Sequence, residues 1–286
     1  MGIFRYLIGL FTSVRSYNVI VVTVAQYLSA LFIFSKKGIL ETLSDWNLHL
    51  LILATACSVA AGYLINNFYD KERDSLNNPI RTQLSNALNT QIHLYYYIVF
   101  NFMGLALASL VSGRAVLFFI IYQVLLWFYS HKVNKILFIN NLAFSILSIF
   151  PVFALLLYYK DFEPYLLVHA GFLGSILLIS DITKDLRTST EDAALGYKTL
   201  PNQFGEQYTK VIIGLLSLLN ILFALGIIQL QQIGKMQYYF ELSIFLVLFA
   251  LFYLLQSKNK QRYFIAQQIF KGIIVLGIFS IILIKF

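Results

Sequence analysis

The segment LHLLILATACSVAAGYLINNFYDKERD, residues 48–74, is an apolar run of membrane-spanning length that ends in charged residues. Asn66 is still inside the apolar part, and Asp70 and Asp74 follow at intervals of four residues. In a helix of 3.6 residues per turn, this spacing drifts by only about 40° per step, so one face presents an amide and two carboxylates. Carboxylates at the end of a membrane helix are costly unless a cation meets them. The segment therefore predicts a membrane helix with an acidic site at one end.

A second apolar run ends in a similar way, in Asp181 and Asp185, and Asp192 would return to them through a loop or a further helical turn. A turn signal lies downstream of each acidic cluster, at residues 77–79 (Asn-Asn-Pro) and at residues 198–201 (Lys-Thr-Leu-Pro). This faint internal repeat predicts two four-span halves, each with one acidic helix end, and a ninth span appended. Paired halves with a site at their interface are common in membrane proteins.

The composition agrees with a polytopic, all-α membrane protein. Of the 286 residues, 59% are hydrophobic and only 12% are Asp, Glu, Lys or Arg, whereas soluble domains have about 25% charged residues. A single cysteine, Cys57, excludes a disulfide framework. We expect nine transmembrane helices, at residues 17–35, 48–68, 92–112, 115–129, 141–159, 164–182, 208–230, 238–256 and 268–285.

The positive charges predict the orientation, because cytoplasmic loops retain lysine and arginine. The side of the N-terminus has most of them: Arg5, Arg15, Lys71, Arg73, Arg81, Lys132, Lys135, Lys184, Arg187, Lys198, Lys210, Lys258, Lys260 and Arg262. The opposite loops have Lys36, Lys37, Arg114, Lys160 and Lys235. We therefore expect a multi-pass protein of the cell membrane, with the N-terminus and both acidic clusters cytoplasmic and Phe286 outside. The net charge of +8 favours anionic lipid headgroups as partners; no basic, aromatic soluble module supports nucleic-acid binding.

The acidic clusters point to magnesium, because carboxylate and amide oxygens without His or Cys are typical Mg²⁺ ligands. The candidate metal ligands are Asn66, Asp70, Asp74, Asp181, Asp185 and Asp192. Two such stripes facing each other could hold a diphosphate between bound magnesium ions. Five cations could neutralise the remaining charge: Arg73, Lys132, Lys135, Lys184 and Lys198. The alternative is that these acids are solvated loop residues that balance neighbouring lysines.

These motifs resemble those of the UbiA superfamily of intramembrane prenyltransferases. The run from Asn66 to Asp74 is similar to the NxxxDxxxD motif of that family, and Asp181 to Pro201 is similar to its second signature. Arg15 to Asn18 resembles the family's R-P-x-N element, and Tyr129 to Lys135 resembles its Y-x-x-x-K/R loop. The resemblance covers nearly the whole chain, so it implies one transmembrane prenyltransferase domain over residues 1–286.

The resemblance implies Mg²⁺-dependent transfer of a prenyl group from an allylic diphosphate to a lipophilic or aromatic acceptor. Asp70, Asp74, Asp181 and Asp185 would be the catalytic residues. The substrate-binding candidates are Arg15, Asn18, Arg73, Tyr129, Lys132, Lys135, Lys184 and Lys198. A snorkelling arginine is an equally good account of Arg15.

Three departures from the family pattern are notable. Ser16 replaces a proline, Arg81-Thr82 stands where many members have R-P, and Thr188 sits where a further acid is common. The last departure weakens the second metal site or changes which oxygens complete it. Within the superfamily, residues 181–201 look most like the branch of geranylgeranylglyceryl phosphate geranylgeranyltransferases, which implies a glycerol phosphate lipid as acceptor.

Other functions remain open at this point. Prenylation of a quinone or haem precursor would use the same motifs, and a UbiA-type terpene cyclase would use the same ionisation without an acceptor. A secondary transporter places ionisable residues near the bilayer midplane, whereas these acids lie at span ends. A CDP-alcohol phosphotransferase would need a D-x-x-D-G-x-x-A-R signature, but Asp74 is followed by Ser75 and Leu76.

Overall fold

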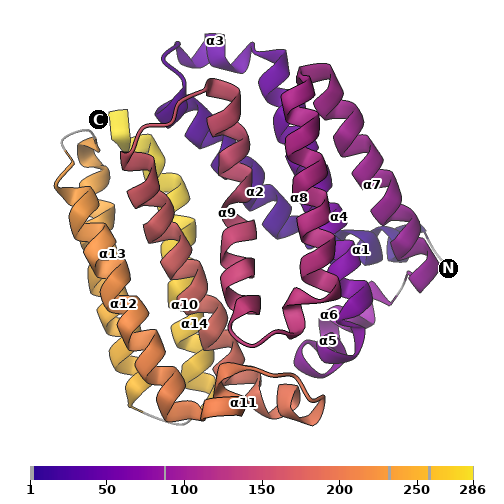
Figure 1. The fold of residues 1–286 in the computed structure, drawn as a ribbon, viewed down its shortest axis with the longest axis vertical. Coiled ribbons are helices and arrows are strands. Elements are labelled where there is room, and N and C mark those ends of the chain that lie inside the picture. The colour runs from indigo at the N-terminus through magenta and orange to yellow at the C-terminus, as the bar shows by residue number, and fades with distance from the viewer. Residues whose placement is uncertain (1–2, 87, 231–232, 257–258, 286) are drawn as a thin grey trace. The chain divides into compact units, whose positions relative to one another are not determined.

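The computed structural model describes residues 3–86, 88–230, 233–256 and 259–285, and these residues are almost entirely helical (Figure 1). Within the described ranges, nine helices are long and apolar enough to cross a membrane: Ser16–Phe34, Trp46–Tyr69, Thr90–Val111, Gly113–Lys135, Ile139–Tyr159, Tyr165–Ala194, Glu206–Ile228, Gly234–Leu255 and Lys260–Lys285. They confirm the all-α fold and all nine predicted spans. Lys258 and Phe286, which entered the topology prediction, lie outside the described residues.

The chain divides into two compact units. The first comprises Met1–Leu31, Ser35–Asn134 and Phe150–Tyr159. Its helices are α1 (Ile3–Ser13), α2 (Ser16–Ser29, continued by a π-helical turn at Ala30–Phe34), α3 (Ile39–Leu43), α4 (Trp46–Tyr69), α5 (Lys71–Asn77), α6 (Pro79–Ser85), α7 (Thr90–Val111) and α8 (Gly113–His131, followed by a 3₁₀ turn at Val133–Lys135).

Helix α4 is the central helix of the first unit, since it packs against α2, α7 and α8. Small side chains allow this close packing, as is usual between membrane helices. Ala54, Ala60 and Ala61 of α4 are buried. A Cβ atom at Gly104 of α7 would come within 3.3 Å of the Ala54 carbonyl oxygen, so that glycine lets the two backbones approach.

The second unit comprises Phe32–Phe34, Lys135–Ile149 and Lys160–Phe286. Its helices are α10 (Tyr165–Ala194), α11 (Leu200–Phe204), α12 (Glu206–Ile228), α13 (Gln237–Leu255, preceded by a 3₁₀ turn at Gly234–Met236) and α14 (Lys260–Ser280, followed by a 3₁₀ segment at Ile281–Lys285). Helix α10 packs against α12 and α14, and α13 contacts both of those helices. Ile176, Ile179 and Ile182 of α10 are fully buried.

Helix α9 (Ile139–Tyr159) contributes to both units, because the division falls between Ile149 and Phe150. The odd helix is therefore the fifth span and not an appended ninth span. Within the first unit, Gln26 of α2 supports the part of α9 around its internal proline. The side-chain amide of Gln26 donates to the Pro151 carbonyl oxygen at 2.8 Å and to the Thr55 hydroxyl at 3.1 Å. These bonds satisfy polar groups that no lipid could bind.

Both predicted turn signals lie at breaks between helices. Asn78 leaves the helical region between α5 and α6, and Pro79 is the first residue of α6. Thr199 precedes α11, whose first turn contains Pro201. Proline is favoured in a first helical turn because its missing N–H has no intrahelical partner there. The polar segment that follows α4 is thus two short helices rather than an extended loop.

Candidate active site

The first acidic cluster lies where α4 ends and α5 begins. Asp70 separates the two helices, yet its N–H donates to the Asn66 carbonyl at 2.9 Å and its own carbonyl accepts from the Asp74 N–H at 2.8 Å. The four-residue spacing of a helix therefore continues through the junction. The Asn66 side-chain amide donates to an Asp70 carboxylate oxygen at 2.8 Å, as expected for residues that share one face.

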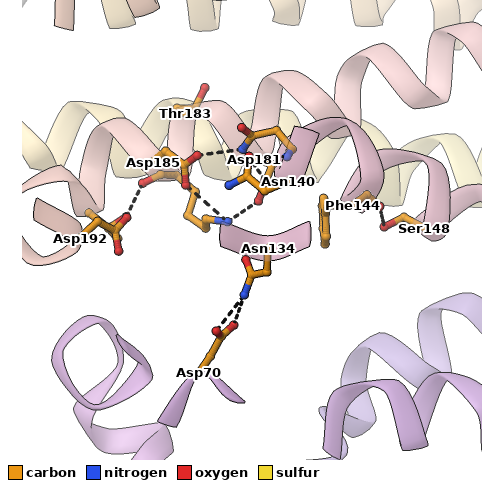
Figure 2. A network of polar contacts seen from close by, with 12 residues as sticks. Asp70, Asn134, Asn140, Phe144, Ser148, Asp181, Thr183, Asp185 and Asp192 are labelled. Atoms are coloured by element: carbon orange, nitrogen blue, oxygen red, sulfur yellow. Dashed lines mark hydrogen bonds and ion pairs between the residues drawn. The ribbon is translucent and has the colours of Figure 1, made fainter. Parts of the chain in front are cut away.

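Asp70 is buried, with 7% of its surface exposed. Asn134 donates to both of its carboxylate oxygens, at 2.8 and 2.7 Å (Figure 2). Burial raises the pKa of the Asp70 carboxyl above its ordinary value, and the neighbouring Asp74 carboxylate adds to the rise. Arg73 and the hydrogen bonds from Asn134 and Asn66 act in the opposite direction, but burial prevails. A buried carboxylate of this kind gains from a bound cation.

Asp74 is bound differently, because its nearest charged partners are two arginines, Arg15 and Arg81. The Arg81 guanidinium forms a short ion pair with Asp74, and the Arg15 guanidinium lies 3.9 Å from the same oxygen. Arg15 also lies 3.4 Å from the Asn66 side-chain oxygen and 4.9 Å from the centre of the Tyr63 ring. The first cluster therefore combines one carboxylate held by amides with one held by guanidinium groups.

The second acidic cluster lies on one continuous helix. The sequence predicted a span that ends near residue 182, whereas α10 continues to Ala194 and includes Asp181, Asp185 and Asp192. These three carboxylates are 6%, 0% and 0% exposed, and Figure 2 shows them along one helix. The sequence left open whether Asp192 returns to the other two aspartates through a loop or through further helical turns. In the structure the helix continues through Asp192.

Polar partners bind each carboxylate of this helix within the second unit. The side-chain nitrogen of Asn141 donates to Asp181 at 2.7 Å and to Asp185 at 2.8 Å. Lys184 forms a short ion pair with Asp181, and its ammonium lies 3.7 Å from Asp185. The Thr188 hydroxyl donates to Asp192 at 2.8 Å. Thr188, the departure from the family pattern, thus orients Asp192.

The sequence analysis missed Asn134 and Asn141. Asn134 lies between α8 and α9, Asn141 lies in the first turn of α9, and they are 4% and 1% exposed. A signal was present, because this segment places amides directly before an apolar run, much as Asn66 stands within one. Their roles depend on tertiary contacts that spacing along the chain does not reveal.

The remaining substrate-binding candidates differ in exposure. Arg73 is buried, Tyr129 is half-buried, and three lysines are exposed: Lys132, Lys135 and Lys198. The Asn18 side-chain amide donates to the Tyr63 hydroxyl at 3.1 Å. Tyr63 therefore contacts both Arg15 and Asn18, so the element at residues 15–18 lies against α4 near the first cluster.

The donor chemistry of both clusters fits magnesium. Among the described residues, no group of three or more His, Cys, Asp or Glu side chains is arranged to hold a metal ion. Each cluster instead pairs carboxylates with amides, and amide oxygens are also ligands of hard cations. The Asn141 side-chain oxygen is buried and has no hydrogen-bond partner among the described residues. An orphaned oxygen beside two carboxylates is a suitable ligand for such an ion.

The model of the UbiA prenyltransferase family matches residues 20–274 of this chain. The chain belongs to the UbiA prenyltransferase family. It is therefore a multi-pass membrane enzyme of the prenyltransferase class, and the resemblance found in its motifs is confirmed. As a family member it is an enzyme, which sets aside the transporter alternative.

Curated relatives of this UbiA-family chain include two archaeal enzymes. It is 24% identical to digeranylgeranylglyceryl phosphate synthase of Thermococcus gammatolerans over 236 residues, which are 82% of this chain and 84% of the relative. It is 29% identical to the enzyme of the same name from Pyrococcus abyssi over 209 residues, 73% of each chain.

Two solved structures have the same fold. One is a digeranylgeranylglyceryl phosphate synthase, with a TM-score of 0.69, 19% identity and coverage of 98% of this chain and 99% of that one. The other is a UbiA homologue from Archaeoglobus fulgidus bound to GPP and Mg²⁺, with a TM-score of 0.69, 14% identity and coverage of 96% and 99%.

Proposed function

We propose that this UbiA-family enzyme transfers a prenyl group from an allylic prenyl diphosphate to a glycerol phosphate lipid such as geranylgeranylglyceryl phosphate. The similarity to synthases named for that product, over 73–82% of the chain, carries this proposal. The run from Asp181 to Pro201 is the part of the sequence that most resembles that branch. Prenylation of an aromatic quinone or haem precursor is the alternative.

The proposed cofactor is Mg²⁺. Asp70 and Asp74, with Asn66, would hold it at the first cluster, and Asp181 and Asp185, with Asp192, would hold it at the second. Bound there, Mg²⁺ would act as a Lewis acid that stabilises the negative charge of the leaving diphosphate. The relative from Archaeoglobus fulgidus was solved with GPP and Mg²⁺, which supports the same pairing of donor and metal here.

The chain's own residues would do the remaining work. When the bond between the allylic carbon and the diphosphate oxygen breaks, its electron pair leaves with the diphosphate, so cationic side chains must stabilise that group. Lys184 lies beside two carboxylates of the second cluster, and Lys132, Lys135 and Lys198 are exposed; these lysines would bind phosphate oxygens. The oxygen of the acceptor hydroxyl would form a new bond to the allylic carbon, and its proton would pass to the released diphosphate or to water. Aromatic faces among the 26 Phe and 19 Tyr would stabilise the developing carbocation by about 0.5–2 kcal/mol each.

We also propose that the acidic clusters and the N-terminus face the cytoplasm of a cell membrane, as the positive-inside rule predicts. A prenyl diphosphate made in the cytoplasm would then reach the site directly.

The test is a product assay with the full chain, purified and placed in lipid nanodiscs. The enzyme is incubated with Mg²⁺, prenyl diphosphates of several lengths, and either geranylgeranylglyceryl phosphate or an aromatic quinone precursor, and products are identified by mass. We expect an ether-linked, doubly prenylated glycerol phosphate. Prenylation of the aromatic alone would favour the alternative, and a cyclised prenyl product without acceptor would indicate a terpene cyclase.

A further inference from the structure

Asn141, the third residue of α9, donates both N–H groups of its side chain to the second acidic cluster. An amide nitrogen carries two hydrogens, and this nitrogen lies 2.7 Å from an Asp181 oxygen and 2.8 Å from an Asp185 oxygen. One NH₂ group thus sits against both carboxylates, the position that a cation would also favour.

The oxygen of the same side chain has no partner. It is buried without a hydrogen bond among the described residues, and Asn141 as a whole is only 1% exposed. Buried side-chain acceptors normally have a partner, so an orphan calls for an explanation. A purely structural link between α9 and α10 would explain the two hydrogen bonds that the nitrogen donates. It does not explain why a residue whose oxygen accepts no hydrogen bond occupies a buried position.

Resting on the proposed function, we propose that Asn141 is a metal-responsive positioning residue of the second cluster. Without metal, its NH₂ group holds Asp181 and Asp185 together, and the Lys184 ammonium, which lies beside the same two carboxylates, offsets their mutual repulsion. When Mg²⁺ enters, the amide turns about its last side-chain bond and its oxygen faces the ion. Half a turn exchanges the nitrogen and oxygen of an amide with little change in shape, and Mg²⁺ prefers oxygen ligands.

The test measures metal binding rather than activity. Mn²⁺ replaces Mg²⁺, and free Mn²⁺ is quantified by electron paramagnetic resonance on the full chain in nanodiscs. All variants are made in an Asp70→Asn background, so that the second cluster dominates the signal. Asn141→Ala should raise the Kd for Mn²⁺ roughly ten- to a hundredfold, the range found when a partner of a metal site is removed. A rise of less than about threefold, well below that range, would overturn the proposal.

Asn141→Asp distinguishes the role of the amide oxygen from that of the amide nitrogen, because the variant keeps an oxygen but loses both N–H hydrogens. We expect this variant to bind Mn²⁺ at least as tightly as Asn141, and to unfold at lower temperature when metal is absent, since three carboxylates then repel. If Asn141→Asp weakened Mn²⁺ binding as much as Asn141→Ala, the oxygen would have no part in binding and the proposal would fail.

Two further variants complete the design. Ser145→Ala is the matched control, because Ser145 lies one turn later on α9, is 3% exposed and donates to the Gly174 carbonyl of α10 at 2.6 Å; its Kd for Mn²⁺ should stay unchanged. Asp181→Asn tests the proposed function itself and should abolish the binding. If Asp181→Asn left the Kd unchanged, the metal assignment would fail. If only Asn141→Ala left it unchanged, the failure would concern Asn141 alone.

Discussion

Asn134 donates its side-chain amide to both carboxylate oxygens of Asp70, at 2.8 and 2.7 Å, inside the first unit. Both hydrogen bonds favour the charged form of Asp70 and oppose the rise in its pKa that burial causes. Asn134, three residues after the end of α8, therefore keeps the carboxylate between α4 and α5 closer to its ionised form.

Asn134→Ala should raise the pKa of Asp70 further, because it removes two bonds that lower it. The ionised carboxylate is the form that would bind the proposed metal, so activity should fall at a higher pH as the solution is acidified. The measurement is the acidic limb of kcat/KM against pH at saturating Mg²⁺, and that limb should move to higher pH. Asn220→Ala is the control, since this equally buried amide donates to the Phe172 carbonyl and the Ser175 hydroxyl. An acidic limb that did not move would contradict the assigned role of Asn134.

Asp70→Asn and Asp181→Asn should each lower turnover by at least about a hundredfold, on the scale of losing a major electrostatic contributor to catalysis. The protein should remain inserted and folded, and EDTA should have the same effect, reversed by Mg²⁺. Glu163→Gln, which alters an exposed acid in the loop before α10, should leave turnover unchanged. Near-native activity of either aspartate variant would show that this carboxylate is not a principal metal ligand.

Asp74 and Arg81 should prove to be coupled in stability. Their side chains are 17% and 29% exposed, so solvent screens the pair only in part. The double variant Asp74→Ala/Arg81→Ala should be more stable than the sum of the single effects predicts, by about 1 kcal/mol. Unfolding by SDS in mixed micelles gives the four free energies required. The same cycle on Lys37 and Glu41, which are 64% and 62% exposed, should give a coupling near zero. Strict additivity at Asp74 and Arg81 would mean that the pair does not hold the first cluster together.

The orientation can be tested with reporter fusions. Gly196 is exposed and lies just after α10, so a reporter inserted there should give a cytoplasmic response. A reporter fused after Phe286 should give the opposite response, because three of the described spans, Glu206–Ile228, Gly234–Leu255 and Lys260–Lys285, follow Gly196. Matching responses would mean that a span is miscounted.

The sequence predicted the helices better than the site, and for a physical reason. Spanning segments need about 20 apolar residues, and that requirement is visible in the sequence alone. The end of α10 was placed too early because Asp181, Asp185 and Asp192 look like residues that leave a membrane. In the structure they are buried, and Lys184, Asn141 and Thr188 supply their polar contacts.

The asparagines that contact these aspartates were harder still to predict from the sequence. Asn66 was found because it precedes two aspartates at helical spacing, which is a local pattern. Asn134 lies 64 residues from Asp70, and Asn141 lies 40 and 44 residues from its two carboxylates. Such contacts depend on which helices pack together. The pattern of a single sequence does not reveal that packing. Arg15 was open to two interpretations, and its distances to Asp74 and Asn66 now favour a role at the first cluster over snorkelling to the lipid.

The nature of the acceptor gives the last prediction. A glycerol phosphate lipid brings a second phosphate, which needs a cation beyond those bound to the donor diphosphate. Lys198 is exposed in the connection between α10 and α11, within the run that most resembles synthases of this lipid class. Losing one charge-assisted phosphate contact should cost roughly 1.5–3 kcal/mol, so Lys198→Ala should raise the acceptor KM by about ten- to a hundredfold.

The control is Lys235→Ala, because Lys235 is equally exposed but belongs to a loop assigned to the opposite side of the membrane; its acceptor KM should not change. Arg15→Ala extends the test, although its contacts with the first cluster mean that the KM of the donor should rise as well. If Lys198→Ala changed only the KM of the prenyl diphosphate, Lys198 would belong to the donor site. Efficient prenylation of an uncharged aromatic, with no turnover of a glycerol phosphate lipid, would refute this acceptor and leave the prenyltransferase assignment intact, since that assignment rests on the family match over residues 20–274.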